Sequence, residues 1–227
     1  MASTAEMNSP NQAAPDSTAL EYRKRIKGDR AAEAYKHRKG SKDRAEQRLV
    51  QRALHHLPSG GSVLDAPCGN GRMTALLARA RFQATGVDLS DGTLAISREE
   101  VEKEGLVTIF LKRDLEALDF PDKHFDGTLC FRFFHHLPTD EIRTRVIGEL
   151  CRVTRKAILI SYMNPWSPTM LKRRLRHLLG GKKSKQHATN LTELKAFFET
   201  RGFRLCDELA QRRFVRSLHL ACFIAEE

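Results

Sequence analysis

Three observations predict an α/β fold with a doubly wound, mostly parallel seven-stranded sheet. The chain has 227 residues, enough for one such domain with a full hydrophobic core. Short β-prone segments alternate with segments of helical periodicity, the pattern of βαβ units with right-handed crossovers. The last two β-prone segments have little chain between them, so we expect a final antiparallel hairpin. Helices should cover both faces of the sheet.

The predicted elements follow this alternation along the chain. Helix-prone sequence ends at Pro58 and Gly60, and Ser90 is a suitable N-cap for the helix that follows it. The predicted strands span 62–66, 82–89, 107–114, 125–133, 156–163, 203–209 and 214–225. The predicted helices between them span 72–79, 91–104, 139–153 and 191–201.

The composition shifts along the chain divide it into three parts. Residues 1–19 are rich in Ala, Ser, Asn and Pro, which predicts a disordered tail. Residues 20–57 are charged and helix-prone and are expected to form an N-terminal helical lid. Residues 58–227 form the main domain, with a basic insertion at 163–190.

Charge and cysteine usage indicate the kind of partner and the cellular compartment of the protein. The formal net charge of +11 and the pI of 9.7 favour anionic partners. The five cysteines are scattered and none stands in a Cys-x-x-Cys pair, which argues against a zinc site or a disulfide framework. We therefore expect no metal and a cytoplasmic protein. The first residues lack the apolar stretch of a secretory signal, and no apolar run approaches the roughly 20 residues of a membrane span.

The stretch from Val63 to Ala80, "VLDAPCGNGRMTALLARA", points to a ligand site. An apolar strand ends at Asp65, and the chain then turns through Gly69 and Gly71 into a helix. Glycines at such a turn let the backbone approach a ligand closely at the carboxyl edge of a parallel sheet.

Two further acids extend this edge. Asp88 ends the second strand, where a carboxylate can accept both hydroxyls of a ribose, and Asp114 follows the third. The dinucleotide fingerprint fails because Thr74 stands where its third glycine belongs, and there is no Gly-x-x-x-x-Gly-Lys-[Ser/Thr] phosphate loop. An acid that opens the loop suits a cation, so the expected cofactor combines a ribose with a positive end.

These motifs resemble those of the class I S-adenosylmethionine-dependent methyltransferases, whose fold is Rossmann-like, with the small-molecule and lipid-modifying, ubiquinone-biosynthesis-like branch most similar. The resemblance covers roughly residues 45–225, and Pro67 departs from it by replacing the first glycine of the loop. It implies that Asp65 meets the methionine amino group and Asp88 the ribose. The cofactor-binding residues it implies are Asp65, Ala66, Pro67, Gly69, Gly71, Asp88, Leu89, Asp114, Leu115 and Phe131.

The lid contributes two further candidates for the methionine end of S-adenosyl-L-methionine. Tyr35 and Arg38 lie where family members often carry a lid helix, although a solvated basic helix is the alternative. Trp166 follows the fifth strand and Tyr162 lies near its end, and the two either line or cap an acceptor pocket or simply pack.

His135 and His136 are the catalytic candidates. They lie just past the fourth strand, where a base could deprotonate an acceptor near neutral pH. The alternative is that one of them packs under the cofactor loop.

The basic insertion bears on the acceptor. From Leu150 to Thr192 the chain holds ten Lys and Arg and no acid. One helical face carries Leu171, Leu175, Leu178 and Leu179. A leucine face among cations predicts a cap for a small-molecule or lipid-linked, anionic acceptor and peripheral contact with the inner face of an anionic membrane. Charge alone also fits an RNA or DNA methyltransferase, which the missing acceptor motifs make less favoured. A non-catalytic S-adenosylmethionine-binding protein is the remaining alternative, and the oligomeric state is open.

Overall fold

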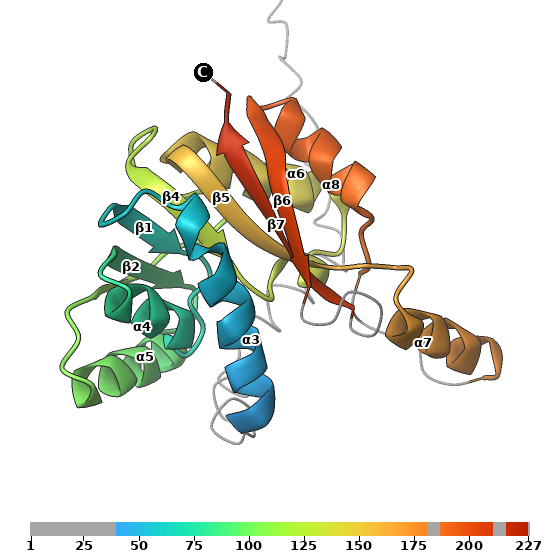
Figure 1. Ribbon diagram of the computed structural model, residues 1–227, viewed down its shortest axis with the longest axis horizontal. Coiled ribbons are helices and arrows are strands. Elements are labelled where there is room, and N and C mark those ends of the chain that lie inside the picture. The colour runs from blue at the N-terminus through green and yellow to red at the C-terminus, as the bar shows by residue number, and fades with distance from the viewer. Residues whose placement is uncertain (1–39, 181–186, 211–216, 227) are drawn as a thin grey trace, which may run out of the picture.

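The fold is a seven-stranded sheet with helices on both faces, seen in a computed structural model (Figure 1). The structure describes residues 40–180, 187–210 and 217–226. The strand order is β3-β2-β1-β4-β5-β7-β6, and every neighbouring pair is parallel except the two that involve β7. The doubly wound sheet and its antiparallel final hairpin, both predicted from the sequence, are confirmed.

Most strands begin and end within two residues of their predicted limits, but β4 ends three residues early, and residues 214–216 of the last predicted strand lie outside the described residues. They are β1 (Ser62–Asp65), β2 (Gln83–Asp88), β3 (Ile109–Lys112), β4 (Phe125–Cys130), β5 (Thr154–Met163), β6 (Phe203–Ala210) and β7 (Leu218–Ala225). Successive strands are added toward one edge of the sheet from β1 to β3 and toward the other edge from β4 onward. The switch falls between β1 and β4, which are adjacent and parallel. This switch point is where ligands bind in open α/β sheets.

Helices form two layers because each face of the sheet is apolar. The helices are α3 (Gly40–Ala53), α4 (Arg72–Arg79), α5 (Asp91–Lys103), α6 (Asp140–Val153), α7 (Pro168–Leu178) and α8 (Leu191–Glu199). Side chains of α3 and α4 share one buried cluster with the sheet, and those of α6 and α8 share another. Two short 3-10 helices, η1 (Leu54–His56) and η2 (Phe134–His136), follow α3 and β4.

The N-terminal region is only partly described. The predicted tail at 1–19 and the first half of the predicted lid, up to residue 39, lie outside the described residues. The second half is α3 and η1, and α3 buries Leu49, Val50 and Ala53 against the sheet. Its role as a lid stays a prediction.

Helix α7 lies in the basic insertion and stands apart from the sheet (Figure 1). Met170 is buried, whereas Leu171, Leu175 and Leu178 are exposed. Within the described ranges no helix has the length and apolar character required to cross a bilayer.

Candidate functional site

The loop between β1 and α4 is shaped by two glycines with positive φ. Gly69 has a φ of 54° and Gly71 a φ of 74°, a region that side chains disfavour. A Cβ on Gly71 would lie 2.9 Å from the Cβ of Ser97, whereas one on Gly69 would meet nothing within 4 Å. Gly71 is therefore needed for close packing against α5, and Gly69 leaves open space beside the loop.

Asp65 ends β1 as a buried carboxyl with one unsatisfied oxygen. Its Oδ2 accepts a hydrogen bond of 2.6 Å from Thr74 Oγ1. Its Oδ1 is buried without a hydrogen-bond partner among the described residues. Burial raises the pKa of Asp65 to about 7, although Thr74 and the Arg72 charge oppose the shift. An unsatisfied buried acceptor of this kind is costly unless a ligand supplies a donor.

Asp88 ends β2 and holds the glycine loop in place. Its Oδ2 accepts from the Gly69 amide at 3.1 Å and its Oδ1 from the Ser90 amide at 3.0 Å. Burial raises the pKa of Asp88, with these backbone hydrogen bonds acting against it. The carboxylates of Asp65 and Asp88 thus frame the two sides of one loop.

A cavity of about 290 Å³ opens between this loop and the segment after β4. Both acids face it, together with apolar and aromatic side chains and two arginines. Its lining residues are Asp65, Pro67, Cys68, Gly69, Asn70, Arg72, Met73, Asp88, Thr93, Phe131, Arg132, Phe133 and His136. Its mixture of apolar walls and a few polar groups is typical of a small-molecule site.

Five of the predicted cofactor residues line the cavity: Asp65, Pro67, Gly69, Asp88 and Phe131. The other predicted cofactor residues among those described (Ala66, Gly71, Leu89, Asp114 and Leu115) do not line it.

The predicted residues outside the cavity have structural surroundings of their own. Ala66 is buried and donates its amide to Leu129, and Leu115 belongs to the core cluster under α6. Asp114 caps its own turn by accepting from the Glu116 amide. Tyr35 and Arg38 lie outside the described residues, so their predicted contact with the cofactor stays a prediction.

The two candidate catalytic histidines occupy different surroundings. His136 lines the cavity, whereas His135 is fully buried and does not. The backbone carbonyl of His135 accepts the amide of His187, which ties η2 to the end of the basic insertion. Of the two, His136 can reach a ligand in this cavity.

The two aromatic candidates for the acceptor pocket also differ in their burial. Tyr162 is buried and its hydroxyl donates to Glu208, while Trp166 is 79% exposed. The packing alternative therefore applies to Tyr162, and Trp166 does not line the cavity described above.

Sequence analysis missed two arginines and the acid that holds them. Glu46 of α3 is 1% exposed and lies between Arg72 and Arg132, both of which line the cavity. Its Oε2 accepts from Arg72 Nη2 at 2.6 Å, and its Oε1 accepts from Arg132 Nη1. Asp43 also binds Arg72. Arg72 stands directly after the glycine turn, which is a usable signal, but nothing local marks Glu46 as buried.

The residues present fit a cationic nucleoside cofactor. The unsatisfied Asp65 Oδ1 can accept from an ammonium group, and Asp88 from ribose hydroxyls. The open space above Gly69 lets such a ligand lie on the loop. The fold and site together define a Rossmann-like protein with a nucleoside site at the switch point of its sheet.

Comparisons with known proteins agree with this class. Residues 63–157 match the family model of the methyltransferase domain. The chain is 38% identical over 106 residues to phosphatidylethanolamine N-methyltransferase from Cereibacter sphaeroides, covering 46% of this chain and 50% of that protein. It is 29% identical over 99 residues to ubiquinone biosynthesis O-methyltransferase from Nitrosospira multiformis, covering 43% and 41%. The chain thus spans half or less of the length of these relatives.

The overall fold also matches solved structures. Magnesium protoporphyrin IX methyltransferase from Synechocystis PCC 6803, solved with bound SAH, aligns with a TM-score of 0.69 and 18% identity over 93% of this chain and 96% of that one. Residues 63–157 therefore match a methyltransferase domain, and the fold of the chain is the one seen in solved S-adenosylmethionine-dependent methyltransferases.

Proposed function

We propose that the chain transfers a methyl group from S-adenosylmethionine to a small-molecule or lipid-like acceptor. The observation that carries this proposal is the unsatisfied Asp65 Oδ1 in a cavity that also holds Asp88 and His136. S-adenosylmethionine supplies a methyl group on a positively charged sulfur, a centre that needs positioning and shielding more than it needs acid catalysis.

The chain's own residues divide the work of binding. Asp65 accepts from the ammonium end of the cofactor, and Asp88 accepts from the ribose at the opposite side of the loop. Arg72 and Arg132, held by Glu46, present cations to the cavity and suit a carboxylate. Phe131 and Phe133 supply apolar wall and keep water from the reacting centre.

His136 is the residue we assign as proton acceptor when the acceptor atom is an oxygen or a protonated nitrogen. It lies in the cavity wall after β4, and a neutral imidazole can take a proton near pH 7. His135, buried away from the cavity, is assigned a structural role.

A lipid-like acceptor is favoured by the surface of α7. Three leucines of α7 and the leucine directly after it are more than half exposed (Leu171, Leu175, Leu178 and Leu179), and Trp166 precedes them. Lys172 and Arg176 are also exposed on the same helix. Apolar side chains among cations suit the headgroup region of an anionic bilayer. The relative named for phosphatidylethanolamine methylation points in the same direction.

The experiment that tests the proposed function begins with cofactor binding. Calorimetry on the full chain should detect binding of S-adenosylmethionine and of its demethylated product. NADH should bind far more weakly. Asp88→Ala should cost roughly 1.5–3 kcal/mol of binding free energy, the range for hydrogen bonds to a charged group. Unchanged affinity in that variant would remove Asp88 from the site.

Methyl transfer itself is measured with labelled S-adenosylmethionine and a panel of lipid, quinol and RNA acceptors. Labelled lipid or quinol supports the proposal. If RNA alone is labelled, the acceptor is a nucleic acid and the proposal is wrong. Cofactor binding without any methyl transfer would favour a non-catalytic binding protein.

A further inference from the structure

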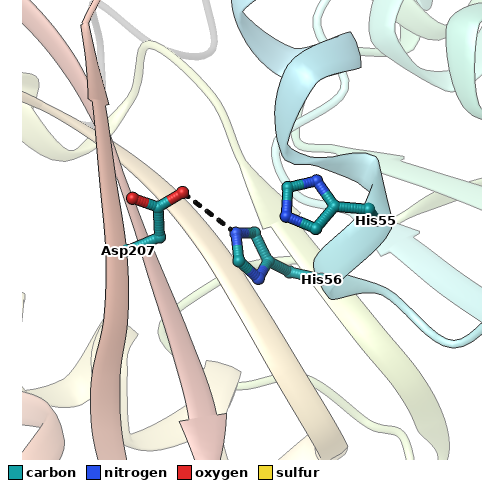
Figure 2. A group of neighbouring side chains, drawn as sticks. All are labelled: His55, His56 and Asp207. Atoms are coloured by element: carbon teal, nitrogen blue, oxygen red, sulfur yellow. Dashed lines mark hydrogen bonds and ion pairs between the residues drawn. The ribbon is translucent and has the colours of Figure 1, made fainter.

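A second group of polar side chains lies on η1 and the edge strand β6, and none of its members lines the cofactor cavity. His55 and His56 are consecutive residues of η1, and Asp207 lies on β6. Figure 2 shows the three side chains pointing toward one another across the gap between the two elements. Residues 151 positions apart in the sequence are therefore brought together here.

The distances within this group suit a bound metal ion. His56 Nε2 lies 3.1 Å from Asp207 Oδ2, and one ligand atom from each of the three residues lies within 4.8 Å of the others. Ligands placed tetrahedrally at zinc bond lengths lie roughly 3.4 Å apart. A small movement of the His55 side chain toward His56 and Asp207 would bring all three ligand atoms to these distances.

In each of the three residues, the ring nitrogen or carboxylate oxygen that would not bind the metal already has a hydrogen-bond partner. His55 Nδ1 lies 2.9 Å from the Arg52 carbonyl, which must accept, so the proton is on Nδ1 and Nε2 carries the lone pair. His56 Nδ1 lies 3.7 Å from Cys206 Sγ, and Asp207 Oδ1 accepts the Glu208 amide at 2.7 Å. Outer partners of this kind orient the ligands in protein metal sites.

An ordinary ion pair between His56 and Asp207 does not account for His55. The two imidazole rings lie with centroids 3.9 Å apart, which is close enough for one ion to contact both. Both rings would bind such an ion as neutral ligands.

We propose that His55, His56 and Asp207 form a binding site for a zinc-type divalent transition metal. Two imidazoles and one carboxylate are borderline ligands that suit zinc and its neighbours, whereas magnesium and calcium prefer oxygen alone. The bound ion joins η1 to β6 and so fixes α3, which carries Glu46, against the sheet. The cysteine pattern predicted no zinc site, and a site built from histidines and a distant aspartate is invisible to that test.

The test uses the full chain stripped of metal with a chelator. Calorimetry with zinc chloride should show one equivalent bound, and elemental analysis after dialysis should give the same ratio. At a free zinc concentration about 100 times Kd, Tm should rise by roughly 5–10 °C. Magnesium chloride at the same concentration should change neither readout.

Variants locate the site. His55→Gln and Asp207→Asn should each weaken zinc binding at least about 100-fold and abolish the Tm rise, since loss of an outer partner alone costs about 10–100-fold. Cys206→Ala should weaken it about 10-fold. His124→Gln, at an exposed histidine elsewhere, is the matched control and should bind as the original chain does.

Unchanged affinity for S-adenosylhomocysteine in each variant shows that the fold and the cofactor site are intact. The proposal is overturned if the original chain takes up no zinc, or if His55→Gln and Asp207→Asn bind zinc as tightly as His124→Gln. Either result would leave the proposed methyl transfer untouched, because no cavity residue is altered.

Discussion

The cofactor side of the sheet and the basic insertion differ in what they bury. Beside β1, β2 and β4, charged groups such as Glu46, Asp65 and Asp88 are nearly inaccessible to water. In the insertion the opposite holds, because Leu175 and Leu178 are 57% and 80% exposed. One region hides polar atoms, and the other exposes apolar ones.

Each arrangement costs free energy in the isolated chain and indicates a partner. A buried carboxyl loses hydration, which a cationic ligand or a buried arginine can restore. An exposed leucine loses the burial that an apolar surface would supply. The difference supports the proposal that the first region binds a small ligand inside it and that the second binds a large surface outside it. Five predictions test this contrast, from the largest expected effect to the smallest.

Glu46→Gln should have the largest effect on stability. It leaves Arg72 and Arg132, each with a side chain 14% exposed, without their shared carboxylate. Breaking a buried charge pair on one side typically costs about 3–5 kcal/mol. Urea unfolding should therefore show a loss of that size in the free energy of unfolding.

A matched control is available in the exposed pair between Arg79 and Glu104, whose side chains are 41% and 44% exposed. Glu104→Gln should cost no more than about 1 kcal/mol, because surface ion pairs are screened by water. Equal losses in the two variants would show that burial does not distinguish the cofactor side.

His136→Ala should act on catalysis and leave stability nearly unchanged. Removing a general base lowers turnover roughly 100-fold or more, which corresponds to about 2.7 kcal/mol of activation free energy. Affinity for S-adenosylhomocysteine should stay within about threefold of the original. His135→Ala should instead destabilise the fold, since that side chain is fully buried. Normal turnover in His136→Ala on an identified oxygen acceptor would contradict the assignment.

Cofactor affinity should rise with pH because of Asp65. Its carboxyl has a pKa of about 7 in the free protein and must be ionised to pair with an ammonium group. From pH 5 to 7 the affinity should therefore increase up to about tenfold per pH unit and then level off. Asp65→Asn should bind weakly and with a much flatter pH profile. A pH-independent affinity in the original chain would show that no proton leaves Asp65 on binding.

The same pKa shift has the opposite consequence for the ligand-free fold. Between the ordinary aspartate pKa of 3.8 and about 7, the folded chain holds a proton on Asp65 that the unfolded chain has released. This residue's contribution to stability is therefore present at low pH and is lost as pH rises through 7, by up to about 1.4 kcal/mol per unit. Thermal unfolding of Asp65→Asn should lack that component.

The fold was predictable because its signals are local. The helix at Arg72–Arg79 was predicted with its observed bounds, and strand limits such as Ser62–Asp65 differ by a residue or two. Alternation of apolar and helical periodicity, with glycine at the turns, fixes these elements within short windows of sequence. The acids at the ends of β1 and β2 were predictable for the same reason, since their places follow from the strands.

The parts that sequence analysis missed depend on contacts between distant residues. Arg132 meets Glu46 across 86 positions, and Asp207 meets His56 across 151. Neither pair leaves a local pattern, because any charged residue on a helix or edge strand fits a solvated surface equally well. Asp114 follows β3 as expected and its side chain accepts from the Glu116 amide, while its contact with the cofactor stays a prediction.

The smallest effect on stability is expected in α7, where the effect on binding should be clear. Leu175→Ser with Leu178→Ser should change the free energy of unfolding by no more than about 0.5 kcal/mol per substitution, because both side chains are already in water. Co-sedimentation with anionic vesicles should nevertheless weaken, since burying a leucine contributes roughly 1.5–3 kcal/mol. Lys172→Gln with Arg176→Gln should weaken it by about 1 kcal/mol per charge.

Val107→Ser is the matched control for these leucines, because Val107 is 93% exposed but lies before β3, away from the insertion. It should bind vesicles as the original chain does. The contrary result is that the leucine variant also binds vesicles as the original chain does while the charge variant loses an RNA binding that depends steeply on salt. In that case the exposed surface of α7 binds nucleic acid, for which phosphate contacts dominate affinity. If the leucine variant alone loses vesicle binding, the contrast between a hidden polar site and an exposed apolar one describes how this protein meets its two substrates.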